Sequence, residues 1–134
     1  MRFQRNLIIF LIGGVLYVGI ELLWRGYSHI SMFFVGGLCF LLIGRQDPNR
    51  SFLLQMLVGT AVITALELLS GLLVNRALGL NVWDYSHLPL NVWGQICLPF
   101  CLLWFPLSGL AVLAEDFSRH LLFGTPMPRY RWVI

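Results

Sequence analysis

The feature that most constrains this chain is a series of long apolar segments separated by short polar ones. Of its 134 residues, 58% are hydrophobic and only 11% are charged. A water-soluble domain of this length needs more polar side chain to cover its surface, so lipid is the expected surrounding. Because a bilayer core about 30 Å thick takes roughly 20 helical residues, the apolar segments predict an all-α bundle of four transmembrane helices in a single domain.

The boundaries of these segments predict spans of unequal length. The second is the shortest and covers only about 22 Å as a helix, less than the hydrocarbon core. Residues 75–95 form a long polar and aromatic connection, and residues 115–134 are expected to form an amphipathic tail at the membrane surface. Pro99 and Pro106 fall inside the fourth span, where each is expected to bend the helix. The predicted spans are residues 7–24, 30–44, 52–74 and 96–114.

Arginine placement predicts the orientation in the membrane. All nine basic residues are arginines, and they stand singly or in pairs at the ends of apolar segments. They form no basic run of the kind that binds nucleic acid. With the N-terminus inside, only Arg25 and Arg76 lie on the outer side, and the other seven lie on the inner side. Because cytoplasmic segments carry the excess of basic residues, both termini are predicted to be cytoplasmic.

The two halves of the chain share a pattern that indicates an internal repeat. The tripeptide ELL begins at Glu21 and again at Glu67, and the tripeptide YSH ends at His29 and again at His87. One insertion near residues 75–81 separates the two registers. Each unit holds two spans, so both units enter the membrane in the same direction. We therefore expect pseudo-two-fold symmetry along the membrane normal.

This repeat predicts a polar layer in the outer leaflet. Glu21 and Glu67 lie about 21–22 Å from the inner ends of their spans, roughly level with the start of the short second span. An ionisable group at the centre of a span costs at least about 2.5 kcal/mol, so each glutamate must be neutral, paired, hydrated or bound. The candidate binding residues of the layer are Glu21, Arg25, His29, Glu67, Asp84, Tyr85 and His87.

Three interpretations of the layer remain open. In the first, Glu21 pairs with Arg25 and Glu67 pairs with Arg76 or a hydroxyl, so that both acids only hold helices together. In the second, the two glutamates are cation or proton sites in a cavity open to the outside. In the third, two glutamates and two histidines hold a metal ion, or the histidines hold a haem. Because the tight spacing of metal ligands is absent, we predict no metal site, and the sequence identifies no cofactor.

The motif WDYSH has a simple structural interpretation as well. Asp84 and Ser86 suit a turn in which their side chains bond backbone N–H groups, and this is favoured over catalysis. The chain has no phosphate-binding glycine loop, and its spacing indicates no nucleophile paired with a base. We therefore predict that the protein is not an enzyme.

Several segments nevertheless resemble one protein family. They are VWDYSHLPLN at residues 82–91, GQICLPF at 94–100, LLWF at 102–105 and ELLSG at 67–71. In these the chain is similar to the CmpB-type family of small bacterial membrane proteins, described as "putative ABC-transporter type IV" or "putative ABC transporter permease". The resemblance covers nearly the whole chain. It implies a multi-pass helical protein of the bacterial cytoplasmic membrane with a role in transport.

The expected function is therefore that of a transporter, permease or channel component for a small solute or ion. Its expected partners are the lipid bilayer and either further copies of itself or other membrane subunits, because four helices make a thin wall for a pathway. The inner loop at residues 45–51 is too short for a helix that couples to an ATPase. The alternative is a non-transporting module, such as an assembly factor, sensor or lipid-binding protein, whose buried polar residues are structural.

Overall fold

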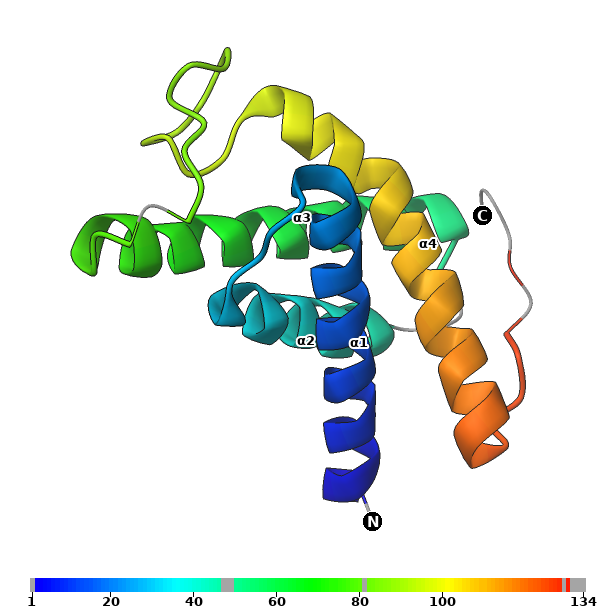
Figure 1. Ribbon diagram of the computed structural model, residues 1–134. Coiled ribbons are helices and arrows are strands. Elements are labelled where there is room, and N and C mark those ends of the chain that lie inside the picture. The colour runs from blue at the N-terminus through cyan, green and yellow to red at the C-terminus, as the bar shows by residue number, and fades with distance from the viewer. Residues whose placement is uncertain (1, 47–49, 81, 129, 131–134) are drawn as a thin grey trace.

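The structure is a computed structural model that describes residues 2–46, 50–80, 82–128 and 130 (Figure 1). Within these residues all the regular secondary structure is helical, and the only extended pairing is an isolated bridge between Val92 and Ile96. The prediction of an all-α fold is thus confirmed. The elements in chain order are α1 (Arg2–Arg25), α2 (Ile30–Gly44), α3 (Phe52–Gly71), the π-helix η1 (Leu72–Ala77) and α4 (Leu98–Phe123).

Three helical stretches are long and apolar enough to cross a membrane, namely Arg2–Trp24, Phe52–Ala77 and Leu98–Phe123. The apolar helix α2 is shorter, with 15 residues. Large apolar side chains lie on the outside of the molecule, and Leu110 on α4 is 62% exposed. Such a surface is unfavourable in water and suits lipid.

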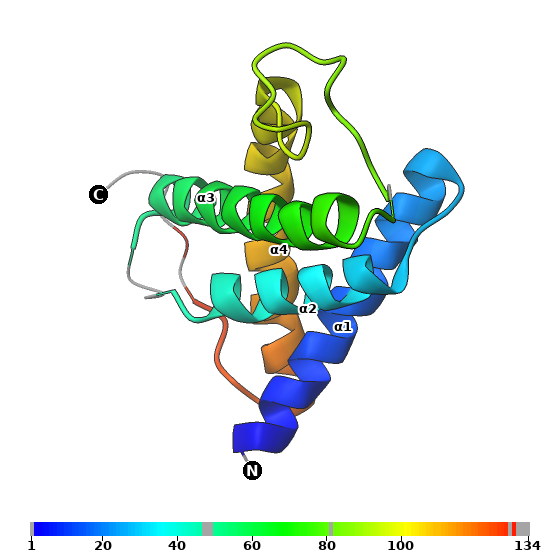
Figure 2. The ribbon, with the colours of Figure 1, turned by 90° about the vertical axis from the view of Figure 1, so that its left-hand side faces the viewer.

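The helices form two closely packed pairs, α1 with α2 and α3 with α4. Figures 1 and 2 show α2 and α3 running side by side in opposite directions, while α1 and α4 cross them steeply. In this arrangement α1 and α4 flank the central pair and hardly touch each other. The predicted two-fold relation between the two pairs stays a prediction.

Small residues allow the α1–α2 crossing to be close. A Cβ atom added at Gly36 would meet the side chain of Tyr17, and one added at Gly14 would meet the ring of Phe33. Contacts of this kind replace the hydrophobic driving force that is missing between helices in lipid. A larger core joins α2, α3 and α4, and its buried residues are Val35, Cys39, Ile43, Phe52, Met56, Ile63, Trp104 and Val112.

Helix α4 differs from its predicted form in two ways. Pro99 lies in the first turn, where a missing N–H breaks no intrahelical bond, so the expected bend at this position is wrong. Pro106 does lie inside the helix. The helix also continues past residue 114 to Phe123, where Gly124 ends it with a φ of 70°. Residues 115–123 of the expected tail are therefore the last turns of α4.

Candidate functional site

The structure brings the two predicted glutamates to one tyrosine between α1 and α3. The hydroxyl of Tyr17 on α1 donates a hydrogen bond to Oε1 of Glu67 on α3, and Glu67 is only 1% exposed. Glu21 follows Tyr17 by one helical turn on the same face of α1. Three polar groups thus meet inside an otherwise apolar part of the molecule.

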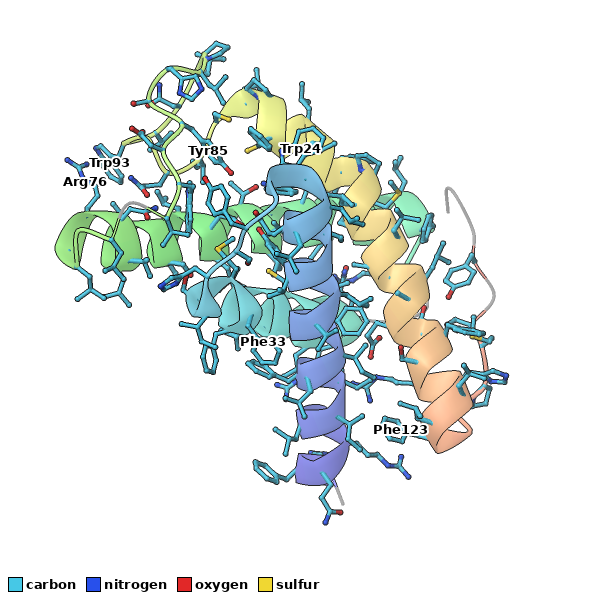
Figure 3. All side chains as sticks on the ribbon, viewed as in Figure 1. Trp24, Phe33, Arg76, Tyr85, Trp93 and Phe123 are labelled. Atoms are coloured by element: carbon cyan, nitrogen blue, oxygen red, sulfur yellow. The ribbon has the colours of Figure 1, made fainter. Side chains whose placement is uncertain are left out.

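An apolar cluster surrounds one side of this polar group. Its buried residues come from α2, η1 and the following loop, and both Tyr17 and Tyr85 pack against it. The ring of Tyr85 also stacks on Phe100 of α4, with centroids 4.7 Å apart and planes inclined by 12°. Tyr85 therefore links the loop to α4, as Figure 3 shows. The cluster consists of Met32, Val74, Val82 and Trp83.

Buried amides fix the loop that follows η1. The side chain of Asn75 donates to Oε1 of Gln95 at 2.8 Å and accepts from the backbone nitrogen of Val82 at 2.6 Å. The indole nitrogen of Trp83 donates to the carbonyl oxygen of Gln95 at 2.9 Å. Because both amides are buried, these bonds satisfy groups that would be costly to leave unpaired. The network closes the loop on the end of α3 and η1.

The other predicted site residues lie in different surroundings. Asp84 and His87 are exposed in the loop, whereas Glu67 is buried. Oδ1 of Asp84 accepts from the backbone nitrogen of Ser86 at 2.9 Å, and this hydrogen bond lowers the pKa of the Asp84 carboxyl. His29 caps the start of α2, where its Nδ1 accepts from the backbone nitrogen of Ser31 at 3.1 Å. The side chain of Arg25 lies outside the described part of the chain.

A cleft of about 570 Å³ opens beside this loop. It combines the cation of Arg76, the carboxylate of Asp84 and the indole of Trp93 with several amides. In Figure 3, Arg76 and Trp93 lie next to each other at the end of η1. Trp93 has a φ of 54°, an uncommon backbone conformation for such a residue. The lining residues are Asn75, Arg76, Trp83, Asp84, Ser86, Asn91, Trp93, Gly94 and Gln95.

Sequence reasoning missed three residues of this region as site residues. Tyr17 shares a helix face with Glu21, and that spacing is the pattern by which it could have been found. Asn75 and Gln95 stand at the two ends of the predicted connection, but their bond to each other spans 20 residues. Among the described residues, no three His, Cys, Asp or Glu side chains gather in a way that could hold a metal ion.

Comparison with known proteins identifies the family. The family model described as "Putative ABC-transporter type IV" matches residues 7–118, a range that runs from α1 into the second half of α4. No curated protein and no solved structure matches the chain. The match includes Glu21, Glu67, the WDYSH motif, the whole of the stretch Phe52–Ala77 and most of the other two stretches able to span a membrane. The resemblance seen in the sequence is thus confirmed, and the chain belongs to the CmpB-type ABC-transporter type IV family of membrane proteins.

Proposed function

We propose that this protein is a membrane-embedded transport component for a small solute or ion, with Glu67, Tyr17 and Glu21 as a proton or cation site. The observation that carries the proposal is the hydrogen bond from Tyr17 to the buried Glu67 between apolar helices. Ionisable groups inside membrane spans are expensive, and they typically mark ion or proton pathways.

The chemistry of the three groups suits reversible binding. An ionised Glu67 is stabilised by the Tyr17 hydroxyl, while its protonated form avoids the cost of a charge in lipid. Glu21 places a second carboxyl one helical turn from Tyr17 on the same face of α1. A proton or small cation bound between the two carboxylates would relieve their mutual repulsion. The site could therefore both bind and release the ion.

The cleft beside the loop gives this site an entrance. Trp83 lines the cleft and also belongs to the apolar cluster against which Tyr17 packs. A movement of Trp83 would therefore connect the cleft with the Tyr17–Glu67 pair. In this proposal both termini are cytoplasmic in the bacterial cytoplasmic membrane, and the cleft faces outward. In this proposal, further copies of the chain or other membrane subunits complete the pathway. The two helix pairs are related by a two-fold axis along the membrane normal.

Proton flux in liposomes tests the proposal. Purified protein is reconstituted with a pH-sensitive dye inside the vesicles, and a potassium diffusion potential set by valinomycin drives proton entry. The wild type is expected to acidify the lumen, and Glu67→Gln and Tyr17→Phe are expected to reduce the rate at least tenfold. Sodium entry is measured in the same way with a sodium-sensitive dye. Tyr27→Phe is the matched control, since Tyr27 is 58% exposed and should leave flux unchanged.

One observation favours the alternative of a non-transporting module. Glu67 lines neither the cleft beside the loop nor the larger cleft at the opposite end of the molecule. In that case its bond to Tyr17 only joins α1 to α3. Wild-type vesicles would then show no flux above protein-free vesicles, and Tyr17→Phe would lower the unfolding temperature, with about 1.5–3 kcal/mol lost with the bond. That pair of results would refute the transport proposal.

A further inference from the structure

A second and larger cleft, of about 1330 Å³, lies at the end of the molecule away from the loop. The first turns of α1, the end of α2 and the second half of α4 form its walls, and residues 125–128 form one edge. The guanidinium carbon of Arg5 lies 5.0 Å from the ring centre of Phe123, and this contact joins α1 to α4 there. The charged side chains that line the cleft are Arg2, Arg5, Arg45, Arg119, Glu115 and Asp116.

Both acidic side chains of the cleft are already engaged. Glu115 is 1% exposed and forms an ion pair with Arg119, one turn further along α4. Oδ2 of Asp116 accepts a hydrogen bond of 2.7 Å from the hydroxyl of Tyr130. Gly44 makes room for this arrangement, because a Cβ atom at that position would meet the carboxyl of Glu115. The acids therefore serve the packing of α4 and leave the remaining arginines of the cleft to other partners.

Three arginines give the cleft an excess of positive charge. Arg2, Arg5 and Arg45 are exposed, and in the described part of the chain none of them forms an ion pair. They come from two different helix ends, so they approach the cleft from different directions. Guanidinium groups arranged in this way suit a phosphate, to which each can donate two parallel hydrogen bonds.

The side-chain amide of Gln46 in the same cleft indicates which kind of ligand would fit. Gln46 donates from Nε2 to the carbonyl oxygen of Gln55 at 3.1 Å, and this bond fixes the orientation of its amide. Its Oε1 is buried, and among the residues that the structure describes it has no hydrogen-bond donor. A phosphate ester with a hydroxyl group would supply a donor for this oxygen while its phosphate meets the arginines. A plain inorganic anion would satisfy the arginines alone.

We propose that this cleft binds a phosphate ester that carries a hydroxyl group. Two sources share this chemistry: the headgroup of a glycerophospholipid such as phosphatidylglycerol, and free glycerol phosphate. Beyond the cleft, α1 and α4 continue as apolar stretches able to span a membrane, so acyl chains of a lipid have a surface to follow. The proposal does not depend on the transport site, which lies on other residues.

Thermal unfolding in detergent tests the binding and separates the two sources. Purified protein is titrated with short-chain phosphatidylglycerol, with short-chain phosphatidylcholine and with glycerol 3-phosphate, and dissociation constants are taken from the rise in unfolding temperature. Phosphatidylglycerol is expected to stabilise the protein, and phosphatidylcholine, whose headgroup has no net charge and no hydroxyl, is not. Stabilisation by glycerol 3-phosphate as well assigns the cleft to the free ester, and stabilisation by the lipid alone assigns it to the headgroup.

Arginine variants locate the binding in this cleft. A basic side chain near a phosphate contributes about fivefold in affinity, so Arg5→Gln with Arg45→Gln is expected to raise the dissociation constant about 25-fold. Arg76→Gln is the matched control, because Arg76 lines the other cleft, and it should leave the constant unchanged. Arg45→Lys keeps the charge but cannot donate two parallel hydrogen bonds, so its dissociation constant should lie between those of the wild type and Arg45→Gln. This order tests the proposal if the double variant loses its helical circular dichroism. Equal stabilisation by phosphatidylcholine, or equal losses in Arg76→Gln and Arg45→Gln, would overturn the proposal.

Discussion

Asn75 shows how a single buried side chain fixes the loop that carries the family motif. Its carbonyl oxygen accepts from two consecutive backbone nitrogens, those of Val82 and Trp83, and its amide nitrogen donates to Gln95. It therefore links the start of the loop, its middle and its end at one point. A helix end in a membrane protein needs partners of this kind, since neither lipid nor apolar protein supplies them.

We expect Asn75→Ala to lower the free energy of unfolding by about 2–3 kcal/mol, because it leaves buried donors and an acceptor without partners. Asn91→Ala is the matched control. Asn91 makes a comparable set of bonds, to Ser86, Leu88 and Gly94, but it is only partly buried and water can replace them. Its loss should stay below about 1 kcal/mol. Unfolding in mixed micelles, followed by tryptophan fluorescence, measures both. Similar losses in the two variants would contradict the role assigned to burial.

Individual residues of the candidate site differ in how far the sequence reveals them. Glu67 is recognisable because an acid within an apolar stretch stands out whatever the fold. Its partner Tyr17 lies 50 residues away, and no periodicity within one helix predicts which side chains of two helices will meet. For Asp84 the sequence indicates a turn, and the bond to Ser86 agrees with that interpretation. The exposure of His87 depends on how the loop folds back, which the motif alone does not contain.

At the scale of the elements, glycines decide how closely α1 and α2 approach. A Cβ atom at Gly36 would meet both the side chain of Tyr17 and the backbone oxygen of Gly13. The crossing therefore sets the position of Tyr17 and, through it, the bond to Glu67. The chain places glycine on both sides of the crossing, so neither helix can accept a larger residue without a shift.

We expect Gly36→Ala to cost about 1–3 kcal/mol, because the helices must separate or Tyr17 must leave its position. Gly19→Ala on α1 is the control: a Cβ atom there meets nothing within 4 Å, and alanine favours the helix, so stability should stay the same or rise slightly. Thermal unfolding of the purified variants gives the comparison. Gly36→Ala should also reduce flux if the wild type shows any. A Gly36→Ala protein as stable as Gly19→Ala would refute the close-packing argument.

The existence of the helices could be predicted far better than their ends. Apolar runs of about 20 residues predict α1, α3 and α4 without knowledge of the helices they pack against. The effect of a proline on α4 depends on where the helix begins. Pro99 fits the first turn, whereas Pro106 lies inside the helix and removes a hydrogen bond. In the continuation of α4 to Phe123, the i,i+4 spacing of Glu115 and Arg119 is visible in the sequence, whereas the bond between Asp116 and Tyr130 spans 14 residues and is not.

For the whole molecule, the sequence indicates the membrane but not the crossing of the helices. Composition and apolar length suffice to exclude a water-soluble surface. The steep crossing of α1 and α4 over the central α2–α3 pair follows from which small residues face each other (Figure 2). Which small residues face each other depends on how each helix is rotated about its own axis, and the sequence alone does not give this rotation. The sequence therefore predicts the class of fold, and the repeat and its symmetry axis stay predictions.

The orientation in the membrane is accessible to a direct test, because the two ends of the molecule differ in charge. Seven of nine arginines are predicted on the cytoplasmic side, together with the larger cleft and both termini. In a variant whose native cysteines are replaced by serine, Ser86→Cys should react with a membrane-impermeant maleimide added to intact cells. Thr125→Cys should react only after the cells are opened. Both positions are exposed in the folded chain, so orientation alone decides their labelling.

Leu110→Cys supplies the control for this experiment. Leu110 is 62% exposed on α4, but its surroundings are expected to be lipid, where a thiol remains protonated and a charged reagent does not enter. It should stay unlabelled in intact and in opened cells. Labelling of Thr125→Cys in intact cells, with Ser86→Cys protected, would reverse the orientation and place the arginine-rich cleft outside. Labelling of Leu110→Cys under both conditions would show instead that this face of α4 meets water and is not in contact with lipid.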